Sequence, residues 1–572
     1  MELLKRYALP AGLALLLAGC GKKADEGAPL AYVPADTPYV IASLEAVPEA
    51  ALEDRFRAIQ PLWKPYFAQI DSLLGEAAGK AKDDAEKRAL AAVRAVLDEF
   101  RERDSLAKWK EIGLDPQGRS ALYGIGLAPV MRLELADAGA FRALIGRIEG
   151  KLGQPLPKAS VAGQEYWRLG ADDVPFAGLL ALEGKHLVVA LAPRQASEGA
   201  LKELLGLTRP TQSMADGKAL RELARERGYQ LQGVGYLDTA RLLERLAGEH
   251  RGVDGEFAAA LSLPTTAADA VCRAELAALA ARLPRTSFGY THFDASEQSF
   301  LVEFDLDAAL RQQLAPLATA VPGMGSQDDA LLDLALALPV LKWKDFWIKQ
   351  SEAVAAAPFR CESLAKLNQG FADMKQGLDR TVPPPLSNLL GLRLTLDSME
   401  LSKDGLPDPA HSGGRMLIAS DNPLLMVSMA QLAAPPLKDL RLALDGKPVA
   451  VPTGAVPLPQ LPVYVAGSAN ALALAAGQGA GANLPPYLAA ATGDGKDLLH
   501  MRITGAFYGV YGDLLGNLMG KSGGEHSELI ELQRQMYQRY RDWMAYTDVR
   551  LALGPHGLAL HQTTRFNPPK AP

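Results

Sequence analysis

Short segments that alternate in polarity with a period of two occur in this chain in the same order twice, and this repetition limits what it can fold into. The clearest segment is Leu331–Leu338, which places leucines on one face and Asp333, Ala335 and Ala337 on the other. Pairs of such segments separated by short turn sequences predict antiparallel hairpins. Longer stretches between them, such as the one containing Leu90, Val93 and Leu97, have helical periodicity.

The second set of expected strands follows the first at offsets of 261 to 292 residues. The matched segments are Tyr39–Glu45 with Leu331–Leu338, Ser120–Ala136 with Leu392–Ser420, Phe176–Ala192 with Val463–Ala476, Leu231–Leu237 with Leu498–Thr504, and Thr286–Leu306 with Thr547–Thr564. Residue identity between the two sets is negligible, so the duplication is inferred from element order alone. Irregular helical inserts argue against a regular βαβ fold.

We therefore expect an α+β protein of two tandem, similar halves, each a large antiparallel sheet of hairpins flanked by helices and helical inserts. The first half covers 32–321 and the second 330–566. The Gly-rich polar stretch 322–329 is the expected linker, and 567–572 an expected disordered tail. A chain of 572 residues is too long for one core, which agrees with a division.

The N-terminus carries Lys5 and Arg6, an apolar run from Tyr7 to Leu17, and then Ala18-Gly19-Cys20. This order resembles a bacterial lipoprotein signal with its lipobox. The resemblance implies a signal peptide over 1–19, cleavage before Cys20 and a lipid on the Cys20 sulfur. Residues 20–31 are expected to form the lipidated cysteine and a flexible tether. Gly21 is not Asp, the inner-membrane retention residue of such lipoproteins, which implies the outer membrane and its periplasmic side.

The run Tyr32–Val40 and the later run Gly113–Gly124 are similar to sequences of uncharacterised proteobacterial envelope lipoproteins, whose mature domain opens with a Pro-Ala-Asp-Thr turn and a strand. The resemblance implies location and architecture, and it transfers no catalytic residue. The net charge of −6 becomes −7 without residues 1–19, and no basic cluster follows. This balance argues against a nucleic-acid partner. The expected partners are the membrane, through the anchor, and an envelope protein or a lipid.

Cys272 and Cys361 remain once Cys20 is assigned to a lipid. In an exported protein an even pair suggests a disulfide, although two buried free thiols remain the alternative.

Motifs for catalysis, cofactors and metals are lacking, so we assign no catalytic, cofactor-binding or metal-binding residue. Gly477–Asn483 opens a helix after a strand, but its glycine spacing differs from that of phosphate-binding loops and favours a turn. The eight histidines form no zinc motif. Trp343 and Trp347 predict helix packing rather than a binding face. Gly505 and Gly509 are four residues apart, and so are Gly512, Gly516 and Gly520; this spacing predicts close packing on the sheet, or alternatively contact with lipid.

These features favour a non-enzymatic, periplasm-facing lipoprotein that binds or scaffolds an envelope partner. The first alternative is a carrier of an apolar ligand such as a lipid. It rests on faces of small residues, for example Ala335 with Ala337, or Ala471 with Ala473 and Ala475. On a curved sheet such a face leaves room for an acyl chain, or alternatively it packs helices closely. The second alternative is a hydrolase whose active site is assembled from dispersed residues, which no local motif would reveal.

Overall fold

The computed structural model describes residues 27–170, 174–263, 267–326, 329–456, 461–520 and 527–568. The expected signal peptide over 1–19, the expected lipidation of Cys20 and most of the expected tether lie outside these residues. So does most of the expected tail, 569–572.

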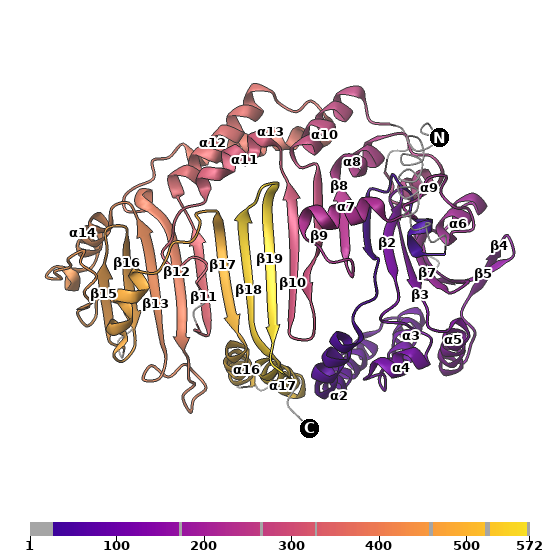
Figure 1. Cartoon of the computed structure of the whole chain (residues 1–572), viewed down its shortest axis with the longest axis horizontal. Helices are drawn as coiled ribbons and strands as arrows, with labels where there is room; N and C mark the ends of the chain where they lie inside the picture. The colour runs from indigo at the N-terminus through magenta and orange to yellow at the C-terminus, as the bar shows by residue number, and fades with distance from the viewer. Residues whose placement is uncertain are drawn as a thin grey trace, which may run out of the picture.

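Strands of one antiparallel sheet run through the whole described chain (Figure 1). In chain order they are β1 (Tyr39–Ser43), β2 (Ser120–Ile125), β3 (Ala128–Glu134), β4 (Lys158–Val161), β5 (Gln164–Leu169), β6 (Phe176–Glu183), β7 (His186–Pro193), β8 (Val234–Asp238), β9 (Arg285–Phe293), β10 (Glu297–Asp305), β11 (Leu332–Ala337), β12 (Leu389–Ser398), β13 (Gly413–Ser420), β14 (Val449–Ala450), β15 (Val463–Gly467), β16 (Ala471–Ala476), β17 (Asp497–Thr504), β18 (Met544–Leu553) and β19 (Gly557–Phe566).

Helices occupy the connections, and most of those labelled in Figure 1 lie along the two ends of the strands. The first half contains η1 (Pro29–Tyr32), α2 (Glu49–Lys80), α3 (Asp84–Phe100), α4 (Leu106–Glu111), α5 (Ala138–Leu152), α6 (Glu198–Leu205), α7 (Lys218–Arg227), α8 (Thr239–Ala247), α9 (Gly252–Ala260), α10 (Ala270–Arg282), α11 (Ala308–Leu314) and η2 (Ala315–Leu317). The second half contains α12 (Val340–Ala356), α13 (Glu362–Leu378), η3 (Leu386–Asn388), α14 (Pro423–Ala433), η4 (Pro435–Leu437), η5 (Ala480–Asn483), α15 (Leu484–Leu488), α16 (Gly505–Gly520) and α17 (Ser527–Trp543).

The pairings give the strand order across the sheet, and they confirm the α+β class. The order is β4-β5-β6-β7-β3-β2-β1-β8-β9-β10-β19-β18-β17-β11-β12-β13-β16-β15-β14. The sheet is continuous, so the halves do not hold two separate sheets. β10 pairs with β19 from Glu297 opposite Arg565 to Asp305 opposite Gly557.

Strand order repeats on the two sides of this central pair. Moving outward from β10, the strands are β9, β8, β1, β2, β3, β7 and β6; moving outward from β19, they are β18, β17, β11, β12, β13, β16 and β15. The strands that correspond in this comparison are those matched along the sequence. The outer edges differ, because the first half adds the hairpin β4–β5, which the sequence pattern did not reveal. The duplication itself stays an inference from this order.

One face of the sheet carries mostly small side chains where helices cover it. In the second half Ala471, Ala473 and Ala475 are buried and cluster with Leu484 and Tyr487 of α15. The expectation that such faces leave room for a ligand is wrong, because helix packing fills the space above them. In the first half, η1, α6, α7 and α9 contribute to the corresponding core.

The expected tether is shorter than predicted at its C-terminal end. Ala28, Leu30 and Ala31 are buried, and Leu30 and Ala31 belong to the core of the first half. The chain is therefore already packed into the body at Ala28, eight residues after Cys20.

The described part of the expected linker is a packed turn. Val321 and Met324 are buried in the core of the second half. Gly323 has a φ of 81°, and a side chain there would meet the Arg393 guanidinium at 1.8 Å. A glycine is required at this position for both reasons.

Two arginines are fully buried beneath the helices, one in each half, and each lies against a tyrosine ring. The Arg132 guanidinium is 3.5 Å from the centre of the Tyr32 ring, donates to the Leu205 carbonyl at 2.9 Å and pairs with Glu183. Arg393 pairs with Asp333 at 2.7 Å and lies 4.4 Å from the Tyr487 ring. Buried cations require such partners.

Cys272 of α10 and Cys361 at the start of α13 form a disulfide, with Cα atoms 4.6 Å apart. The bridge joins the last helix before β9 to a helix of the second half. It therefore crosses the boundary between the halves away from the β10–β19 ladder.

Replacing both cysteines, Cys272→Ser with Cys361→Ser, should lower the free energy of unfolding by about 4 kcal/mol, since the bridge closes a loop of 89 residues. Denaturant unfolding of the mature protein measures this. Reductant should destabilise the wild type by a similar amount and leave the variant unchanged. Equal stability of the two unreduced proteins would contradict the prediction.

His186 should make the protein less stable in mild acid. Burial and the nearby Arg132 lower the pKa of His186 from 6.5 to about 4. As the pH falls from 6.5 to 4, the unfolded chain takes up this proton first, so stability present above pH 6.5 is lost. In a pH series of unfolding measurements, His186→Phe should remove about 2 kcal/mol of this loss. His411→Gln, at an exposed histidine, should retain it.

Candidate apolar binding site

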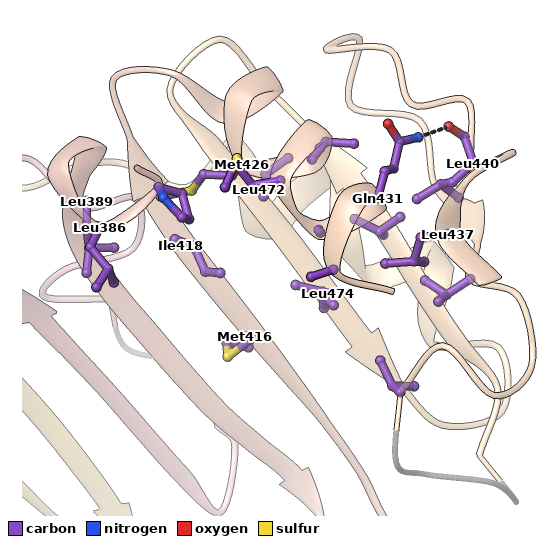
Figure 2. Close-up of a pocket in the computed structure, with 18 of the residues that line it drawn as sticks. Leu386, Leu389, Met416, Ile418, Met426, Gln431, Leu437, Leu440, Leu472 and Leu474 are labelled. Atoms are coloured by element: carbon purple, nitrogen blue, oxygen red, sulfur yellow. Dashed lines mark hydrogen bonds between the residues drawn. The ribbon is translucent and has the colours of Figure 1, made fainter. Parts of the chain in front are cut away.

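A cavity of about 700 Å³ lies between α14 and the face of the sheet opposite the buried alanines (Figure 2). The described residues that line it come from strands β12, β13, β15 and β16, from α14, and from the segments around η3, η4 and β14. They are Pro385, Leu386, Leu389, Leu392, Met416, Ile418, Met426, Val427, Met429, Ala430, Gln431, Ala433, Leu437, Leu440, Val451, Val456, Val465, Leu472 and Leu474.

Strand alternation builds the floor of the cavity. In β16, Leu472 and Leu474 face the cavity while the alanines between and beside them face the opposite core. β13 repeats the arrangement, since Met416 and Ile418 line the cavity and Leu417 and Ala419 are buried on the other face. Directly paired residues, Met416 with Leu474 and Ile418 with Leu472, make this floor continuous.

Helix α14 forms the roof, and most of its apolar surface is not buried. Asn422 caps the helix by accepting a hydrogen bond from the Leu425 amide at 3.1 Å, and Pro423 occupies the first turn. No residue from Pro423 to Ala433 is charged, yet Pro423 is the one buried residue of the helix. Leu432 is 80% exposed. An apolar helix with so little buried surface spans the cavity instead of closing it.

The chemistry of the lining suits a hydrocarbon. Gln431 is the one described lining residue with a side-chain nitrogen or oxygen, and its Nε2 donates to the Leu440 carbonyl at 2.9 Å. Figure 2 shows this bond beside the apolar lining. The Gln431 amide is therefore the one hydrogen-bonding side chain that the described lining offers a ligand, and its nitrogen is already bonded within the protein. Its volume is within the usual range for ligand sites, and Met416, Met426 and Met429 can adapt to ligand shape.

Other features considered from the sequence have structural roles. Trp343 and Phe346 of α12 pack with the Leu314–Leu317 region, while Trp347 is 38% exposed. The glycines of α16 allow close approach to α17 rather than to the sheet, as Gly512 against Tyr537 illustrates. Gly477 and Gly479 form the turn before η5.

The cavity itself was not predicted. The sequence signal that would have pointed to it is an uncharged helix, Pro423–Ala433, beside strands whose large residues alternate with alanines. Periodicity alone does not say which face of a strand a helix will cover.

In the described part of the chain, no cluster of three or more His, Cys, Asp or Glu side chains is placed to hold a metal ion. None of the described helices combines the length and apolarity needed to cross a bilayer. The chain matches no protein-family model, no curated protein and no solved structure.

Proposed function

We propose that this protein is a lipid-anchored protein of the bacterial envelope that binds an apolar ligand, such as the acyl chain of a lipid, in the cavity beneath α14. The observation that carries the proposal is the lining, which is apolar apart from the internally bonded Gln431. Apolar surface exposed in an empty cavity favours a ligand that removes it from water.

The cavity favours the carrier over the scaffold that the sequence placed first. A scaffold protein binds its partners on its outer surface, so a scaffold function would not account for an apolar cavity of this size. A hydrolase is supported less, because the described lining contains no Ser, Cys, His, Asp or Glu to act as a nucleophile or general base on a bound ester.

The proposed location is the periplasmic side of the outer membrane, and its support is the signal-like order of residues before Cys20. The chain is already packed into the body eight residues after that cysteine. Even fully extended, this length spans only about 28 Å. An anchored body would therefore stay close to the lipid surface that supplies its ligand.

Replacing Cys20 with Ser should remove the protein from the outer membrane, because the acyl chains attached to the sulfur provide the expected anchor. The measurement is the distribution of the full chain between outer-membrane, inner-membrane and soluble fractions. Wild type should sediment with the outer membrane and Cys20→Ser should be absent from it. Retention of the variant in the outer membrane would contradict the anchor, and recovery of both proteins in the cytoplasm would contradict export.

Filling the cavity should weaken ligand binding. Val427→Trp places a large ring in the cavity, and excluding two methylene groups at ~0.8 kcal/mol each weakens binding roughly tenfold. The matched control is Ser428→Trp, which adds the same ring at the next, exposed position of α14. Titration with a fluorescent fatty acid measures both.

The proposal expects saturable binding by wild type and by the control. Failure of wild type to bind either the fatty acid or a phospholipid would refute the carrier and return the scaffold to first place. Equal affinities of the two tryptophan variants would show that binding occurs elsewhere.

A further inference from the structure

The face of the sheet that forms the cavity floor continues beyond the cavity as an unbroken row of apolar residues, which we name the apolar row. Each member is paired directly with the next one across the ladder, and the row includes every strand except the edge strands β4 and β14. From β5 to β15 it consists of Trp167, Leu180, Val189, Met131, Leu122, Ile41, Gly235, Phe288, Val302, Leu560, Leu551, Leu499, Leu336, Leu392, Ile418, Leu472 and Gly467.

The apolar row is covered at its ends and accessible in its middle. At one end Trp167, Leu180 and Val189 belong to the core that includes residues of α3 and α5, and at the other Leu392, Ile418 and Leu472 line the cavity. Between Met131 and Leu336, Leu551 is the one row member that joins a core cluster among the described residues. Ile41 is 44% exposed and Leu122 37%, whereas Phe288, Val302 and Leu560 at the centre are half-buried and Gly235 is buried.

The glycine in the middle does not interrupt the row. A side chain at Gly235 would meet Phe288 Cε2 at 2.5 Å, so the Phe288 ring lies where that side chain would be. The row thus presents apolar atoms from strand to strand. With strands ~4.8 Å apart, its length along the sheet is roughly 75 Å.

From this continuity we infer that the apolar row is an extended binding surface for the acyl chains of membrane lipids, which enter it from the cavity or reach the cavity along it. The inference rests on the proposed function, since the cavity is one end of the same surface. An acyl chain spans about half of a ~30 Å hydrocarbon core, so the row has room for several chains in sequence.

Acyl chains fit the row better than a protein partner does. Protein interfaces carry about one hydrogen bond per 100–200 Å², whereas the row's side chains offer none beyond the Trp167 indole at its covered end. Hydrocarbon needs no such bonds. In its middle the row is a continuous apolar surface that includes the exposed Ile41 and Leu122, and contiguous exposed apolar surface of this kind marks a site of interaction.

The test uses the mature full-length protein with vesicles of phosphatidylethanolamine that carries a photoreactive diazirine on one acyl chain. After irradiation, mass spectrometry locates the labelled residues. We expect label in the cavity and on row strands far from it, including β1, β2, β9, β10 and β19. Label confined to the cavity would overturn the extended surface and leave the proposed function standing, whereas absence of label throughout would overturn both.

A variant distinguishes the row from non-specific labelling. Ile41→Glu puts a charge in the row in the first half, far from the cavity, and should reduce labelling of β1, β2 and β3 at least about fivefold because hydrocarbon does not solvate a carboxylate. Leu246→Glu is the control, since Leu246 is 42% exposed on α8 and lies outside the row. Cavity labelling should persist in both. Equal first-half labelling of the two variants would overturn the inference, as would a dimer whose protein crosslinks join row to row.

Discussion

The pairing of β10 with β19 is the contact on which the rest of the architecture depends. It joins the last strand of the first half to the last strand of the second, from Glu297–Arg565 to Asp305–Gly557. Without it, each half would end in an unpaired strand edge that invites association with other chains. The pair also sets Val302 opposite Leu560, and so fixes the register in which the apolar faces of the two halves meet.

Because side chains alternate between the two faces of a strand, the register of the β10–β19 pair decides whether the apolar row is continuous across it. A shift of one residue between β10 and β19 would bring Val302 opposite His561 or Ala559, which face the other way, and would break the apolar row at its centre. The row therefore requires correct register at every strand pair as well as apolar residues. The ends of the row are covered because helical inserts fall there: α3 and α5 pack on the row at one end, and α14 spans it at the other.

Local patterns in the sequence were enough to predict most elements and their order, including the hairpins around β2–β3 and β18–β19. They were not enough to predict that the two halves share one sheet, because the partner of β10 lies about 260 residues away and no local signal encodes it. The cavity was missed for a related reason. Alternation in Leu332–Ala337 identifies two faces, but the packing of α15 decides that the alanine face is buried. The burial of Arg132 and Arg393 also could not be predicted from hydrophobic periodicity, because it depends on partners distant in the sequence, Glu183 and Asp333.

The central strands carry opposite chemistry on their two faces, apolar in the row and polar on the other side. Opposite the row, Glu303 and Asp305 pair with Arg227 from α7, and His500 contacts Asp548 at 3.0 Å.

The polar groups of the face opposite the row are satisfied by ion pairs and water. Covering the row, in contrast, contributes a favourable free energy of ~25 cal/mol for each Å² of apolar surface removed from water. Antiparallel sheets commonly solvate the polar face and pack the apolar one. In the middle of this sheet the polar face meets that rule, whereas on the other face the helices α11 and α12 reach Leu551 alone among the row members of the described chain. Acyl chains on the row would supply the missing layer, and they would do so without the directional bonds that a helix or a second protein needs for its polar groups.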